Sequence, residues 1–221
     1  MTLHPIVLDP TVREALVNQT KTLAANDVRR ETGETADGPA TAALLAGEIT
    51  NGALRHLGNG VDPFELERGL RVAHDIAVDA LRHLAQASPE EAMVPGAGFV
   101  YVRALAILEL EEPHFFEDVR EGVHLLRFAL EEPARELARK LGLPPDEVIS
   151  KMREGHGAIG LDPATGELVD LAHAGVMTPT RVVQAVLDAA VSSVVSLLRV
   201  LAQAARIDRC NEPKGRMRPW P

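Results

Sequence analysis

The chain has 221 residues, enough for one large domain or two small ones with a buried core. Its net charge of −9 argues against a nucleic-acid surface, which needs a basic face, and its composition is that of a soluble, acidic, cytoplasmic protein. A single cysteine, Cys210, excludes an internal disulfide and a thiolate metal cluster within one chain.

Apolar periodicity predicts helices along almost the whole chain and almost no alternating strand pattern. Breaks rich in Gly, Pro, Asn and Asp separate these helices, for example Gly58-Asn59-Gly60 followed by Asp62-Pro63. No basic region followed by an apolar run opens the chain, so no signal peptide is expected. The expected helices, in chain order, span residues 11–30, 37–56, 62–84, 99–110, 116–141, 144–153 and 179–206.

Individual residues predict where some of these helices begin, bend and pack. Asp9 is the expected cap of the first helix, with Pro10 at its first position. Pro133 is expected to kink or split the helix over 116–141, because it removes one backbone hydrogen bond. The helix over 62–84 carries an apolar stripe formed by Leu66, Leu70, Ala73, Ala77, Ala80 and Leu81.

The last helix is the most apolar part of the chain. Thr178 is expected to cap it and Pro179 to begin it. Its length raises the question of a membrane span, but charged residues such as Asp188 and Arg199 interrupt it. We therefore expect a buried core helix and no membrane association. Residues 208–221 are polar and rich in proline, and are expected to form a disordered tail.

Glycine-bearing loops precede the helices at three places, residues 35–43, 94–103 and 160–170. Backbone N–H groups at a helix N-terminus suit a phosphate, and the Asp37 carboxylate suits Mg²⁺. Taken singly, each loop is better explained as an ordinary helix-start turn. None of them has the pattern of a Walker A loop or a GxGxxG fingerprint.

A metal site and a nucleophile are the competing hypotheses. Glu117, Glu121 and His124 share one helix face and resemble half of a carboxylate-bridged metal site. Such a site needs a second Glu-x-x-His on a facing helix, and none of the other expected helices carries one, so a solvated charged face is the better interpretation. The chain has no Gly-x-Ser-x-Gly elbow, and Cys210 falls in the expected tail.

In their order and spacing, four segments resemble the nucleotide-binding equatorial domain of the chaperonin family, both GroEL-like and TCP-1-like. The fourth follows the family pattern most closely, almost residue for residue. The segments are ADGPATAALLAGEITNGALRHLGNGVDPFELERGLRVA (36–73), VPGAGFVYVRAL (94–105), the region of LEEP and LGLPPDEVISKMREG (130–155) and GLDPATGELVDLAHAGVMTPTRVVQAVLDAAVSSVVSLL (160–198).

This resemblance implies an all-α, equatorial-domain-like helical bundle over residues 1–207, with at most short β segments. It implies a site for ATP or ADP with Mg²⁺, and it places Asp37 at the metal. Asp162 and Pro163 take the adenine-side positions of the family and Thr178 the ribose-contact position. The implied site residues are Asp37, Gly38, Thr41, Gly96, Ala97, Gly98, Asp162, Pro163 and Thr178.

The chain departs from the family at several of these places. Ala36, Pro39 and Ala40 replace a glycine and two hydroxyl residues, and Ala97 adds a methyl group to the triple-glycine loop. The sequence runs from the helix over 62–84 almost directly into VPGAG, so the apical domain and most of the intermediate domain are missing there. The family's catalytic aspartate belongs to that region, and Asp79, which weakly resembles it, is expected to be exposed.

We therefore expect a chaperonin-like protein with a degenerate ATP site, which binds nucleotide weakly or not at all and lacks efficient ATPase activity. It would act in protein folding or assembly, or as an oligomeric scaffold with itself, a protein partner or a client. A still-active nucleotide-binding chaperone and, with less support, a metal-binding helical bundle are the alternatives. Whether the opening segment PIVLD pairs with a neighbouring subunit stays open at this point.

Overall fold

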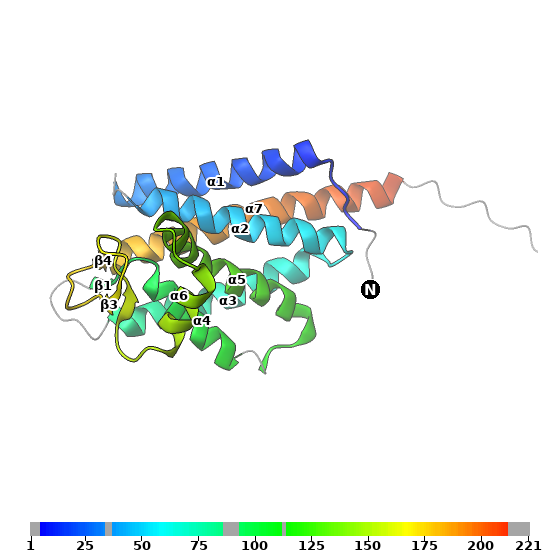
Figure 1. Ribbon diagram of the computed structural model, residues 1–221. Helices are drawn as coiled ribbons and strands as arrows, with labels where there is room; N and C mark the ends of the chain where they lie inside the picture. Colours follow the sequence, from blue (N-terminus) through cyan, green and yellow to red (C-terminus); the bar gives the residue numbers. More distant parts are fainter. Residues whose placement is uncertain (1–4, 34–36, 86–92, 112–113, 212–221) are drawn as a thin grey trace, which may run out of the picture.

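The computed structural model describes residues 5–33, 37–85, 93–111 and 114–211, without the side chains of 117–118 and 206–211. The expected all-α fold with short β segments is confirmed (Figure 1). The helices are α1 Pro10–Thr32, α2 Gly38–Gly58, α3 Pro63–Ala85, α4 Phe99–Glu111, α5 Glu117–Lys140, α6 Pro145–Glu154 and α7 Thr180–Asn211. The strands are β1 Met93–Pro95, β2 Ile159–Leu161, β3 Leu168–Asp170 and β4 Met177–Pro179.

The ends of the first two helices follow the local signals of the sequence. Asp9 caps α1, because its carboxylate accepts a hydrogen bond of 2.9 Å from the Thr11 backbone N–H, and Pro10 fills the first position. After α2, Gly60 adopts the left-handed conformation, with φ 86°, and turns the chain toward α3. These two boundaries are set locally, which is why the sequence predicts them.

Helix α7 lies along α1, α2 and α3, and so connects the α1–α2 pair to α3 (Figure 1). The apolar stripe expected on α3 is fully buried, with Leu66, Leu70 and Ala73 at 0% exposure. Between α1 and α2, the buried hydroxyls of Thr20 and Thr50 form a hydrogen bond of 2.8 Å. The main core therefore forms where α3 and the α1–α2 pair meet α7.

The crossing of α3 and α5 requires glycine on both helices. A Cβ at Gly69 would lie 2.0 Å from the Val119 carbonyl oxygen, and one at Gly122 would lie 2.4 Å from the Leu66 carbonyl oxygen. Both obstacles are backbone atoms, which cannot rotate away. The two helices therefore pack backbone against backbone at this point.

A second, smaller core lies between α4, α5, α6 and the β2–β3 hairpin. Gly160 lets the hairpin approach it, because a Cβ there would lie 2.5 Å from the Leu171 side chain. This core supports the loop before α4 as well as the hairpin, both of which carry predicted site residues. Its buried members are Phe99, Val102, Ala134, Ala138, Val148, Ile149, Met152, Leu161 and Leu171.

Some local expectations are corrected. Of the two effects expected of Pro133, a kink or a split, the split does not occur, because α5 is continuous from Glu117 to Lys140 with buried Ala129 and Ala134 on either side of the proline. Thr178 and Pro179 are not the start of the last helix but lie in β4, where the backbone of Thr178 pairs with Val94 of β1.

Helix α7 also continues past the expected end near Arg206 to Asn211, and the expected tail beyond it lies outside the described residues. Its segment Thr180–Ala205 is long and apolar enough to cross a bilayer, but 67% of its apolar window is buried inside the protein. That burial is typical of the core helix that the sequence predicts.

Candidate functional site

The β1–β4 ladder brings together two predicted site positions that are far apart in the sequence. The backbone N–H of Gly96 donates to the Val176 carbonyl at 2.9 Å, directly after the paired strands. A Cβ at Gly96 would lie 2.7 Å from Oγ1 of Thr178. The Thr178 hydroxyl therefore sits beside the glycine loop, so close that a side chain at Gly96 would require it to move.

The loop Gly96-Ala97-Gly98 is tightly wound against α5. Ala97 has φ 53° and is the one non-glycine residue with positive φ among the described residues. Gly98 follows with φ 77°, and a Cβ on it would lie 2.8 Å from the Ala134 backbone nitrogen. The left-handed conformation costs an L-residue about 1–2 kcal/mol, so the alanine is held there by its surroundings. The contact with Ala134 could not be predicted, because it joins a loop to a helix more than thirty positions farther along the chain.

At the start of α2, Asp37 is exposed and its side chain makes no capping hydrogen bond. Thr41 is turned back onto the same residue, because its hydroxyl donates to the Asp37 carbonyl oxygen at 2.8 Å. Gly38 and Pro39 are buried between these two residues. The Asp37 carboxylate therefore remains open to a cation, whereas the proton of the Thr41 hydroxyl is already engaged.

The 160–170 loop is the turn of the β2–β3 hairpin. Both carboxylate oxygens of Asp162 close this turn, one accepting from the Ala164 N–H at 2.9 Å and the other from the Thr165 hydroxyl at 3.0 Å. Gly166, at φ 73°, completes the turn with a hydrogen bond of 2.9 Å to the Asp162 carbonyl. Pro163 lies exposed at its tip. The residues of this loop therefore have a structural explanation that requires no ligand.

The described contacts join only some of the predicted positions. They link Gly96 to Thr178 and Thr41 to Asp37, while Asp162 stays within its own hairpin. In Figure 1 the start of α2 and the start of α7 lie at the same end of the bundle as the labelled strands. The nearby cation Arg103 is engaged in packing, since it stacks on the Phe99 ring at 5.0 Å and donates to the Gly155 and Gly157 carbonyls.

The structure also places the residues of the other hypotheses, the possible catalytic aspartate and the possible metal site. Asp79 is 68% exposed and pairs with Arg82 at 3.1 Å, which confirms the exposed position expected for it. Glu121 faces α2, where its carboxylate lies 3.1 Å from Nδ1 of His56. Among the residues whose side chains are described, no group of three or more His, Cys, Asp or Glu side chains could hold a metal ion, and the Glu117 side chain lies outside that set.

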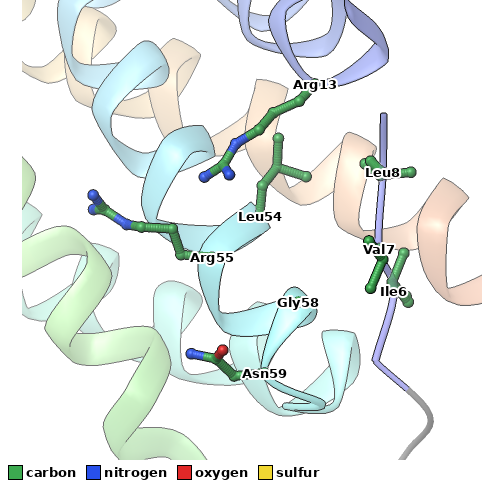
Figure 2. Close-up of a pocket in the computed structure, with 8 residues that line it drawn as sticks. All are labelled: Ile6, Val7, Leu8, Arg13, Leu54, Arg55, Gly58 and Asn59. Carbon is green, nitrogen blue, oxygen red and sulfur yellow. The ribbon is translucent and has the colours of Figure 1, made fainter. Parts of the chain in front are cut away.

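A hollow of about 430 Å³ lies at the opposite end of α2, between that end and the opening segment of the chain (Figure 2). The segment is held by a hydrogen bond of 3.0 Å from the Ile6 N–H to the Leu57 carbonyl. Val7 is 82% exposed. Since α2 is about 30 Å long, this hollow is separate from the candidate site at the first turn of the helix. Its lining residues are Ile6, Val7, Leu8, Arg13, Leu54, Arg55, Gly58 and Asn59.

Comparisons with known proteins agree with the resemblance seen in the sequence. The profile of the TCP-1/cpn60 chaperonin family matches residues 72–202. Chaperonin GroEL 5 of Bradyrhizobium diazoefficiens is 39% identical over 145 residues, which are 66% of this chain and 26% of that protein. A solved structure, the open-state monomer of a group II chaperonin from Methanococcoides burtonii, is 28% identical with a TM-score of 0.46 over 48% of this chain and 28% of that one. The chain thus spans about a quarter of the length of this curated relative.

Proposed function

Because the chain belongs to the TCP-1/cpn60 chaperonin family, we propose that it is a cytoplasmic, equatorial-domain-like member with a degenerate nucleotide site. Its role is in protein folding or assembly, or as an oligomeric scaffold. The observation that carries the proposal is that two of the side chains at the family's nucleotide-contact positions are bonded within the protein. The Asp162 carboxylate closes its own turn and the Thr41 hydroxyl donates to Asp37.

ATP hydrolysis needs a metal-binding carboxylate, donors around the γ-phosphate and a carboxylate that positions water. Asp37 supplies the first of these. At the phosphate loop Pro39 has no N–H to donate, and Ala97 presents a methyl group in place of open backbone. Asp79 is solvated and paired with Arg82, so it supports no role in positioning water. Together these features favour loss of efficient turnover.

The internal layout supports the same proposal. Helix α3 ends at Ala85 and β1 begins at Met93, so a segment of only a few residues joins the two parts of the equatorial-like bundle. This segment is too short to contain a domain that binds clients through an apolar surface. Client binding by this chain, if retained, would use the surface of the bundle itself, and self-association would provide the scaffold.

Calorimetric titration with ATP and with ADP, in the presence of Mg²⁺, tests the degenerate site. We expect no saturable heat from the wild type below about 1 mM nucleotide, a binding free energy weaker than about −4 kcal/mol. Asp37→Ala should behave as the wild type does. Asp27→Ala is the matched control, because it removes an exposed carboxylate from α1, where Asp27 pairs with Arg30.

Micromolar binding that disappears in Asp37→Ala but persists in Asp27→Ala would overturn the proposal and establish the alternative of a working nucleotide-binding chaperone. Light scattering on the same samples tests the scaffold role separately. We expect an assembly larger than one 23.8 kDa chain, and a monomer at all concentrations would contradict self-association.

Restoring the loops is a complementary experiment. The variant Pro39→Thr/Ala40→Thr/Ala97→Gly returns a backbone donor, two hydroxyls and an unhindered glycine to the positions where the sequence departs from the family. If these departures are the cause, the variant should gain Mg²⁺-dependent ATP binding by at least about tenfold, or about 1.4 kcal/mol. Unchanged heat in a folded triple variant would place the defect elsewhere.

A further inference from the structure

A polar hollow of about 280 Å³ lies on the seam between α3 and α7. It is about 20 Å along α7 from Thr178, as judged by 1.5 Å of rise per residue, so it is distinct from the candidate nucleotide site. Helix α3 contributes charged side chains to it and α7 contributes hydroxyls and one cation. The lining residues are Arg71, His74, Asp75, Val191, Ser192, Val195, Ser196 and Arg199.

Two guanidinium groups share one buried carboxylate at this hollow. Oε1 of Glu67, a residue only 9% exposed, accepts from Nε of Arg71 at 3.0 Å and from Nε of Arg199 at 2.9 Å, and it lies 2.8 Å from Nη2 of Arg199. Burial alone would raise the pKa of Glu67, but these hydrogen bonds and charges lower it, so the carboxylate is ionised. Two positive charges against the one negative charge of Glu67 leave a surplus positive charge at this end of the hollow, and the Asp75 carboxylate lines the hollow one turn farther along α3.

Donors remain available on both guanidinium groups. Within the described part of the chain, the two terminal nitrogens of Arg71 and Nη1 of Arg199 have no hydrogen-bond acceptor on the protein. Ser192, an exposed residue, lies on the same face of α7 as Arg199, and Ser196 donates to the Ser192 carbonyl at 2.9 Å. The donors therefore come from two helices and approach the hollow from different directions.

At the other end of the hollow, His74 pairs with the lining residue Asp75 and with Asp188, which lies beside the hollow on α7. Nε2 of His74 lies 2.7 Å from the Asp188 carboxylate and Nδ1 lies 3.1 Å from that of Asp75. Each carboxylate is thus turned toward the imidazole. The hollow has a cationic end formed by Arg71 and Arg199 and an acidic end closed by His74.

We propose that the cationic end of this hollow binds a phosphate group, either free phosphate or a phosphomonoester, between Arg71, Arg199 and Ser192. Guanidinium groups bind phosphates through parallel N–H bonds, and a serine hydroxyl adds a further donor. The planar carboxylate that two arginines would hold is already present as Glu67. The remaining donors come from two helices that line one hollow, and this arrangement suits a tetrahedral anion with oxygens in several directions.

Thermal unfolding and isothermal titration at constant ionic strength test this site, with inorganic phosphate as the probe and chloride as the balancing anion. We expect saturable binding by the wild type with a Kd of about 1 mM or tighter. Arg71→Gln should weaken it at least about tenfold, while Glu67 keeps its hydrogen bond and ion pair with Arg199. Arg82→Gln is the control, because it removes the same charge from an exposed position of α3 outside the hollow.

Equal binding by wild type and Arg71→Gln, or no saturable binding by the wild type, overturns the proposal. If Arg71→Gln does not fold, as judged by circular dichroism, Ser192→Ala takes its place and should weaken binding about threefold or more. Glycerol 3-phosphate in a second arm distinguishes the sources: tighter binding than phosphate assigns the site to phosphomonoesters, and equal or weaker binding to free phosphate. Asp37→Ala should bind phosphate as the wild type does, which separates this site from the nucleotide site.

Discussion

At the scale of single residues, Ala97 is the position where the chain departs most clearly from its conformational preference. Its φ of 53° suits glycine, and relief of about 1 kcal/mol of strain should exceed the roughly 0.5 kcal/mol of extra unfolded-state entropy that glycine brings. We expect Ala97→Gly to raise the free energy of unfolding by about 0.5 kcal/mol in urea denaturation. Ala164→Gly, in an exposed turn without positive φ, should lower it, and a loss of stability in Ala97→Gly as well would refute the strain argument.

Single residues can be predicted from the sequence only where their surroundings are local. The cap at Asp9 and the buried stripe around Leu66 depend on neighbours within two turns of helix, so the sequence predicts both. Thr178 carries the ordinary signal of a helix cap, but its backbone pairs with Val94, more than eighty positions away. A three-residue strand has no periodicity to detect, and its partner is fixed only by the packing of the whole bundle. The contact of Gly96 with Thr178 was therefore inaccessible from the sequence alone, although the family resemblance named both residues.

At the scale of elements, the α3–α5 crossing depends on Gly122. A Cβ there would meet the Leu66 carbonyl oxygen at 2.4 Å and the Leu70 nitrogen at 2.6 Å, so the helices must separate. We expect Gly122→Ala to lower the free energy of unfolding by about 2 kcal/mol or more, despite the better helix propensity of alanine, as measured by urea denaturation. Gly58→Ala is the control, because nothing lies within 4 Å of its Cβ position. Equal effects of the two substitutions would show that propensity, and not the crossing, governs the result.

At the scale of the whole molecule, His74 makes the stability of the α3–α7 packing depend on pH. Burial alone would lower the pKa of His74, but hydrogen bonds to Asp188 and Asp75 and their charges raise it above the usual 6.5. The folded state therefore binds the proton more tightly than the unfolded state, so this contribution is complete below pH 6.5 and is lost as pH rises through the folded pKa. In phosphate-free buffer, we expect the stability of the wild type relative to His74→Gln to fall between about pH 6 and about pH 8. His83→Gln, which replaces an exposed histidine of the same helix, is the control and should show the same change of stability with pH as the wild type. If His74→Gln also shows the same change of stability with pH as the wild type, the proton on His74 does not affect the α3–α7 packing.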